Sequence, residues 1–135
     1  MDGGNPPSEP IANIVELVEK LQIHNSNITI FLEEIAPANS ETMTSSLTTN
    51  LNVFNSQIVS IADSLTTNTS KVIALDMNTH FNESYLADDV HYNKLGAKFI
   101  ADIYFAGIDS EFSSTTLPAI KILPLGDSRV ESNRP

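Results

Sequence analysis

Residues 28–32, Ile-Thr-Ile-Phe-Leu, are the strongest indication of the fold in this sequence. Its β-branched and aromatic residues favour an extended strand, and its apolar character is typical of a strand buried on both faces. A second run of this kind, Lys-Val-Ile-Ala-Leu-Asp, occupies residues 71–76. Buried strands of this type occur in parallel sheets that helices cover, so the two runs together predict an α/β fold.

Segments with helical periodicity flank both strands. Upstream, apolar residues recur at helical spacing over residues 11–21, and Ser8 is a suitable cap. Between the strands, a Thr-rich stretch from Ser40 to Leu65 has apolar residues every three or four positions and predicts a long helix. Downstream, a loop leads to a final helix that Asn93 caps and that continues to about Phe105. The order helix, strand, helix, strand, helix is typical of a parallel sheet with helices packed on it.

The end of the sequence predicts a change of domain. Gly107 is a plausible helix stop, and the small polar residues within 108–119 predict a linker. Residues 120–125, Ile-Lys-Ile-Leu-Pro-Leu, then predict a third strand that ends in a Gly-Asp-Ser turn. We therefore divide the chain into residues 1–107, the linker, and residues 120–135.

Composition and charge exclude several classes of function. Hydrophobic residues make up 41% of the 135 positions and charged residues 18%, as in ordinary globular proteins. Seventeen Asp and Glu against seven Lys and Arg give a formal net charge of −10, which repels phosphate backbones and anionic membranes but not neutral sugars or esters. The absence of cysteine excludes disulfides and thiolate metal sites. No stretch has the roughly 20 apolar residues of a membrane span, and no signal peptide follows Met1. We expect neither a nucleic acid nor a membrane as partner.

Four polar residues suit the chemistry of a serine ester hydrolase. Such an enzyme needs a hydroxyl nucleophile, a histidine that takes its proton, a carboxylate that orients the histidine, and donors for the oxyanion. Ser128 follows an apolar strand in a turn that exposes it. His91 lies three residues after Asp88, a spacing that lets the carboxylate contact one imidazole nitrogen and leaves the other facing a nucleophile. Asn5 follows two glycines, so its amide is a candidate oxyanion donor.

Each of these signals also has an ordinary structural interpretation. Taken alone, Gly-Asp-Ser is more often a plain strand-to-loop turn and Asp-x-x-His a solvated acidic loop, while Asn5 is equally well explained as a loop residue. The neighbouring Asp89 is a second candidate for the orienting acid, although the three-residue spacing favours Asp88. His24 and His80 have no carboxylate at a suggestive spacing, and we expect them to be surface residues.

The combination resembles the SGNH/GDSL hydrolase family, in its branch of carbohydrate acetyl esterases. Residues 123–128, Leu-Pro-Leu-Gly-Asp-Ser, are similar to the first block of that family. Residues 88–96, Asp-Asp-Val-His-Tyr-Asn-Lys-Leu-Gly, are similar to its last block and are the most specific match. Residues 2–5, Asp-Gly-Gly-Asn, resemble its third block.

The resemblance implies both a fold and a chemistry. The fold would be a flavodoxin-like three-layer sandwich with a parallel sheet, here incomplete. Ser128 would be the nucleophile, His91 the general base, Asp88 the acid that orients it, and Asn5 an oxyanion donor. The family implies a serine esterase that deacetylates a small-molecule or polysaccharide ester, uses no metal or organic cofactor, and is secreted.

The sequence departs from the family in two respects. Pro6 stands where the family usually has an Asp after the Asn. The blocks also stand in the wrong order, since the Gly-Asp-Ser block comes last. The family's glycine block and the strand before its Asn block are missing. Either the chain is a fragment of a tandem protein with an adjacent domain of the same family, or it is a circular permutant in which Ser128 folds back to His91. The missing glycine block favours the fragment, so we expect the isolated chain to be inactive or weakly active.

Two other functions are compatible with these residues. A non-catalytic carbohydrate-binding or adhesive module could keep the fold without the chemistry, and Pro6 after Asn5 favours this interpretation. A structural remnant of a truncated gene would have an unpaired strand edge and would be poorly soluble.

Overall fold

The structure is a computed structural model that describes residues 8–113. Three long helices, two strands and one short 3-10 helix follow one another in the order α1 (Ser8–His24), β1 (Thr29–Glu33), α2 (Ser45–Leu65), β2 (Lys71–Leu75), η1 (Glu83–Tyr85) and α3 (Lys94–Phe112). Within this range no helix has both the length and the apolar character that crossing a membrane requires.

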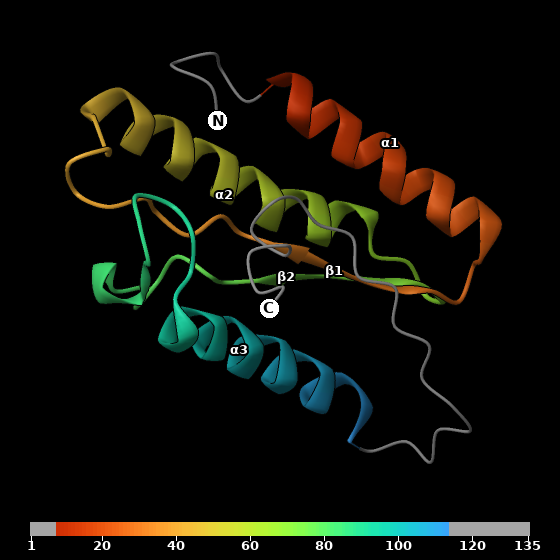
Figure 1. The fold of residues 1–135 in the computed structure, drawn as a ribbon. Coiled ribbons are helices and arrows are strands. Elements are labelled where there is room, and N and C mark those ends of the chain that lie inside the picture. Colours follow the sequence, from red (N-terminus) through yellow and green to blue (C-terminus); the bar gives the residue numbers. More distant parts are fainter. Residues whose placement is uncertain (1–7, 114–135) are drawn as a thin grey trace.

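The two strands pair in parallel and in register, from Thr29 beside Lys71 to Glu33 beside Leu75. Helices α1 and α2 lie on one side of this sheet and α3 on the other, which gives three layers (Figure 1). The predicted α/β fold with a parallel, helix-covered sheet is therefore confirmed. Within residues 8–113 the sheet has two strands, since the predicted third strand at residues 120–125 lies outside the described residues.

Each face of the sheet has its own apolar core. On the face of α1 and α2, Val18 and Ala62 pack with Ile30 and Val72 of the two strands. On the face of α3, the second core consists of Ala36, Leu75 and Met77, with Phe31, Ile73, Phe81, Tyr92, Ile100, Ile103 and Tyr104 packed against them. Neighbouring residues of one strand thus enter opposite cores, which is why the strand sequences are apolar on both faces.

Helix α2 begins five residues later than the sequence predicted. It starts at Ser45, because the Thr44 side chain accepts a hydrogen bond from the Leu47 amide and so caps the helix. Residues upstream form a turn in which the Asn39 side chain accepts from the Thr42 amide. Short polar side chains such as Thr44 and Asn39 bind backbone amides and so set where a helix begins. The apolar periodicity alone did not reveal this start.

Gly107 does not end the last helix, so this prediction was wrong. Helix α3 runs through it to Phe112, and the predicted linker at 108–119 therefore begins with helical residues. A Cβ atom at position 107 would lie 2.7 Å from Cδ2 of Leu75. The glycine thus lets α3 approach the sheet closely, a role in packing that the sequence does not distinguish from a helix stop.

The side chain of Asn55 joins α2 to the chain that leaves β1. It is 4% exposed, and it both accepts a hydrogen bond from the Ile35 amide (2.8 Å) and donates one to the Ile35 carbonyl (2.9 Å). These two bonds satisfy backbone groups that no strand pairs at this position. They fix the segment that follows β1 at the carboxyl end of the sheet.

Replacing Asn55 with Ala should destabilise the protein by about 2–4 kcal/mol, because two partly buried backbone groups of Ile35 lose their partner. Urea unfolding followed by circular dichroism measures the change. Asn52→Ala is the matched control, since Asn52 is an exposed asparagine of the same helix. A similar, small effect of both substitutions would contradict this role for Asn55.

Candidate active site

The candidate site lies in the loop between β2 and α3, at the carboxyl end of the parallel strands (Figure 1). Ligands of open α/β folds bind at this edge, since strand ends and helix starts converge there. The loop includes η1 and the segment from Leu86 to Tyr92, two residues that form an isolated antiparallel bridge. This bridge closes a small hairpin that carries Asp88 and His91.

Asp88 and His91 are in direct contact. Oδ2 of Asp88 lies 2.8 Å from Nδ1 of His91. The other oxygen, Oδ1, accepts hydrogen bonds from the amides of Val90 (2.9 Å) and His91 (2.8 Å). One carboxylate therefore shapes the turn with one oxygen and orients the imidazole with the other.

This arrangement selects a tautomer of His91. A carboxylate beside Nδ1 favours a proton on that nitrogen, so the lone pair is on Nε2. The side chain of His91 is 35% exposed, and that of Asp88 is 57% exposed. Nε2 of an accessible, oriented imidazole can accept a proton from a hydroxyl that is brought to it.

The hydrogen bonds lower the pKa of Asp88 to about 2, with the His91 amide the largest cause, followed by the Val90 amide and the His91 side chain. Asp88 is therefore a carboxylate throughout the neutral and mildly acidic range. A permanent negative charge beside Nδ1 stabilises the imidazolium that forms when His91 takes a proton.

Asp89 does not contact His91 but ties the hairpin to the segment after β1. Its side chain accepts a hydrogen bond from Nδ2 of Asn39 (2.7 Å), and its carbonyl accepts one from the Asn39 amide (2.9 Å). The two neighbouring acids therefore have separate tasks. Asp88 orients the histidine, and Asp89 anchors the loop that carries it.

Asn93 is the residue on which this loop depends most. Its Oδ1 caps α3 by accepting hydrogen bonds from the amides of Leu95 (2.8 Å) and Gly96 (3.1 Å). Its Nδ2 donates to the carbonyls of Ser84 (2.7 Å) and Leu86 (3.1 Å). The cap was predicted from the sequence. The second pair of bonds was not, because only the fold brings η1 beside the start of the helix.

Gly96 allows η1 to pack directly on α3. A Cβ atom at this position would lie 2.3 Å from the Tyr85 carbonyl oxygen. Four aromatic rings pack around this contact, and the neighbouring ring centroids are 5.3–5.8 Å apart. They belong to Phe81, Tyr85, Tyr92 and Phe99. A side chain at position 96 would separate η1 from the helix and move the hairpin.

Two further acids lie where the strands end, and the sequence did not identify them as neighbours. Burial, followed by the charge of Asp76, raises the pKa of Glu34. Burial acts to raise the pKa of Asp76 as well, but hydrogen bonds from Thr79 and Asn78 and the charge of His80 outweigh it, so the pKa of Asp76 is lowered. His80 thus lies near a carboxylate, and its backbone has a positive φ of 66°. The spacing of these residues in the sequence carried no such signal.

Ser128 and Asn5 both lie outside the described residues, so their predicted roles as nucleophile and oxyanion donor stay predictions. His24 ends α1, remote in the chain from the hairpin. Within residues 8–113 no group of three or more His, Asp or Glu side chains is arranged to hold a metal ion. Among the described residues the structure brings together the Asp88–His91 pair and the loop that holds it.

Gly96→Ala should displace the Asp88–His91 hairpin and destabilise the protein by about 1–3 kcal/mol, because backbone rather than a flexible side chain blocks the added methyl. Urea unfolding and the imidazole chemical shifts of His91 report the two effects. Gly107→Ala is the matched control in the same helix: its methyl meets Leu75 rather than η1, so it should leave the His91 shifts unchanged even where it lowers stability. Unchanged His91 shifts in the Gly96 variant would contradict the proposed packing role.

Asp88 should titrate near pH 2, below the ordinary value of 3.8. Because its pKa is lower in the folded chain, its contribution to stability is complete above about pH 4 and is lost as the pH falls through about 2. NMR titration of the side-chain carboxyl carbon measures the midpoint, and the Asp88→Asn variant identifies the signal. A midpoint at or above 3.8 would show that the hydrogen bonds to Val90 and His91 do not form in solution.

Comparison with known proteins gives a likeness of fold. No protein-family model matches this sequence, and no curated protein matches it. Two solved structures are similar. A mutant of an acetyl esterase with acetate ion has a TM-score of 0.71 at 20% identity, with 84% of this chain and 53% of that chain covered. A carbohydrate esterase of family 3 from Talaromyces cellulolyticus has a TM-score of 0.71 at 19% identity, with 85% and 54% covered. The chain thus spans about half the length of these esterases and shares the fold of that half.

Proposed function

We propose that this chain carries the acid–base element of a serine ester hydrolase of SGNH/GDSL type, and that its substrate is an acetylated carbohydrate. The observation that carries the proposal is the 2.8 Å contact between Asp88 Oδ2 and His91 Nδ1, on a loop at the carboxyl edge of a parallel sheet. The likeness of fold to an acetyl esterase and a carbohydrate esterase supports the same reaction class.

In this reaction His91 removes the proton from a serine hydroxyl as that oxygen attacks the ester carbonyl. The imidazolium then gives the proton to the leaving alcohol, and an acyl-enzyme is left. Water, activated by the same imidazole, hydrolyses the acyl-enzyme and releases acetate. Asp88 stays ionised throughout, since its pKa of about 2 is far below working pH.

The serine that we propose is Ser128, and Asn5 is the proposed oxyanion donor. The sequence lacks the glycine block that supplies a further donor in the family it resembles, and loss of one donor lowers turnover by about a hundred- to a thousandfold. We therefore propose weak turnover by the chain alone. A domain of the same family beside this one would supply the missing groups.

An acetylated carbohydrate also suits the charge of the chain. A net charge of −10 disfavours anionic substrates such as phosphate esters, whereas an acetyl ester of a neutral sugar carries no charge. Release of acetate during turnover matches an acidic protein as well, because an anionic product is repelled. An extracellular location is part of the proposal, since polysaccharide esters are encountered there.

The test is hydrolysis of p-nitrophenyl acetate and of an acetylated xylo-oligosaccharide by the full chain. We expect weak turnover that falls to the level of buffer in His91→Ala and in Ser128→Ala. Asp88→Asn should lower the rate by at least about tenfold, because its amide oxygen can still accept the turn's backbone bonds while the charge that stabilises the imidazolium is gone.

His24→Ala is the matched control and should leave the rate unchanged, since His24 lies at the end of α1 and is not part of the loop. It also separates enzymatic turnover from hydrolysis by any exposed imidazole. If the full chain and its His91→Ala variant hydrolyse both esters at the same rate, the proposal is wrong. Binding of the oligosaccharide that survives His91→Ala without turnover would instead favour a carbohydrate-binding module.

A further inference from the structure

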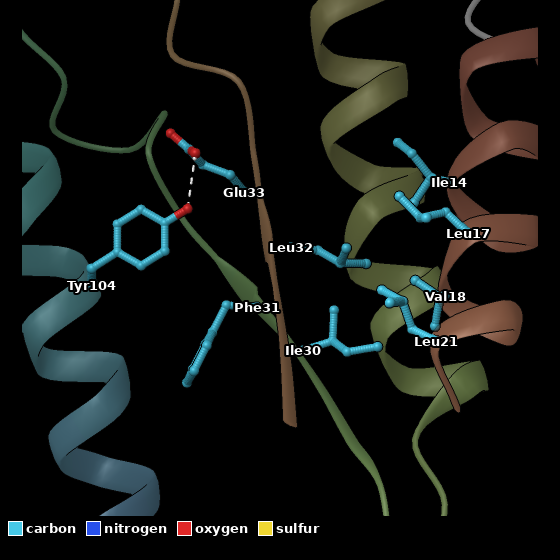
Figure 2. A pocket seen from close by; sticks show the side chains of 9 residues that line it. All are labelled: Ile14, Leu17, Val18, Leu21, Ile30, Phe31, Leu32, Glu33 and Tyr104. Atoms are coloured by element: carbon cyan, nitrogen blue, oxygen red, sulfur yellow. Dashed lines mark hydrogen bonds between the residues drawn. The ribbon is translucent and has the colours of Figure 1, made fainter. Parts of the chain in front are cut away.

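A groove runs along the outer edge of β1, between α1 and α3. Its volume is about 210 Å³. Figure 2 shows that residues of α1 form one wall, β1 the floor, and Tyr104 of α3 the opposite wall. Leu17 lines it and is 47% exposed. Large apolar side chains around an open groove favour an occupant that covers them.

The floor of this groove is an open strand edge. β1 pairs with β2 on one side, and in the described part of the chain no strand lies on its other side. A strand that is covered by helices on both faces but is open along one edge presents backbone donors and acceptors in a ready geometry. The occupant that satisfies such an edge is another extended segment.

The two walls differ in chemistry. On the side of α1, the lining is entirely apolar and consists of Ile14, Leu17, Val18 and Leu21 with Ile30 and Leu32 of β1. On the side of α3, Phe31 is accompanied by Glu33, whose carboxylate accepts a hydrogen bond from the Tyr104 hydroxyl (3.0 Å). An added strand with one wholly apolar face and one mixed face would match these walls.

Chain topology leads to the same edge. The crossover from β1 to β2 passes through α2 on one face, and α3 lies on the opposite face (Figure 1). Because crossovers between parallel strands are right-handed, a crossover through a helix on the opposite face proceeds in the opposite direction. A right-handed crossover from β2 through α3 therefore leads back toward β1. The position beside β2 on that side is already occupied by β1. The next position is the outer edge of β1.

The last turn of α3 also lies at the end of the sheet where the parallel strands begin. Lys71, the first residue of β2, forms an ion pair of 2.7 Å with Glu111 in the last turn of α3. The helix therefore ends beside the start of the strands, where a further parallel strand would begin. Residues 113–119 separate the end of the helix from the next apolar run, a length just above the usual 2–6 residues between a helix and a strand.

We propose that residues 120–125, Ile-Lys-Ile-Leu-Pro-Leu, add to the outer edge of β1 as a third parallel strand and fill this groove. In an extended conformation Ile120 and Ile122 share one face, which matches the apolar wall of α1. Lys121, with Leu123 and Leu125, occupies the other face, which matches the mixed wall of α3. Pro124 has no amide hydrogen, and an edge strand tolerates it where that position faces away from the sheet.

The added strand would also bear on the proposed function. Only this chemical consequence rests on the proposed function. A parallel strand here ends at the carboxyl edge of the sheet, so the Gly-Asp-Ser turn that follows would lie on the same edge as the loop of Asp88 and His91. Docking of the strand itself does not depend on catalysis. Its test can therefore fail or succeed independently of esterase activity.

The test uses two cysteine pairs in the full chain, which has no cysteine of its own. Leu17→Cys with Ile122→Cys places both thiols on the α1 side, whereas Leu17→Cys with Leu123→Cys places them on opposite faces of the added strand. Under mild oxidation the first pair should close within one chain at least about tenfold faster than the second, since a disulfide needs Cβ atoms about 4 Å apart. Peptide mapping by mass spectrometry identifies the bond, and circular dichroism confirms folding.

Equal rates for the two pairs would overturn the proposal, because a mobile tail does not distinguish the faces of a strand. Disulfides between chains would show that a second copy occupies the groove. Thiols that stay reduced would show that residues 120–125 do not dock there. Either result overturns the proposal. A second measurement avoids substitutions in the groove: Leu123→Pro should speed hydrogen exchange of the β1 amides, and Val130→Pro, beyond the strand, should not. Equal exchange in both variants would likewise overturn it.

Discussion

The parallel pairing of β1 with β2 determines where each helix of this chain packs. Parallel strands cannot be joined by a tight turn, so the chain must cross over a face of the sheet. Helix α2 makes that crossover, and α1 lies beside it on the same face. The opposite face must then be covered by another element, and α3 covers it through Gly107, which permits close approach to Leu75. The loop that carries His91 is the connection between β2 and this covering helix.

The site is held by polar groups that each perform two tasks. Asp88 shapes its own turn with one oxygen and orients His91 with the other. Asn93 caps α3 with its oxygen and holds the carbonyls of Ser84 and Leu86 with its nitrogen. One backbone hydrogen bond, from the Ala87 amide to the His91 carbonyl (2.7 Å), closes the hairpin between these two anchors. An exposed acid–histidine pair therefore keeps a fixed geometry without being buried.

The described residues share the fold of about half of each similar esterase structure, and the outer edge of β1 is open in them. The neighbours of known structure are about twice its described length, and the groove lies along the edge of β1. Solvent is a poor partner for an edge with an apolar helix on either side. The same physical requirement, a partner for a strand edge and for two helix faces, thus connects the incomplete fold to the proposed place of Ser128.

The sequence by itself determined the α/β class, the positions of both strands to within one residue, and the Asn93 cap. Buried strands, amphipathic helices and caps are local patterns of residue type, and they can be read without knowing the fold. The Asp-x-x-His spacing was local as well, which is why the contact between Asp88 and His91 could be anticipated. The start of α2 and the continuation of α3 beyond Gly107 could not, because Thr44 and the Leu75 contact override the apolar periodicity.

Only the tertiary structure decided which residues distant in sequence support the site. The bonds of Asn55 to Ile35 and of Asp89 to Asn39 join segments that are separated along the chain. The open edge of β1 has the same origin, because it depends on which strand lies beside which. Such pairings follow from how the helices close over the sheet, and they leave no periodic pattern in the sequence. The local pattern therefore determined the elements and the acid–histidine turn, whereas packing determined their neighbours.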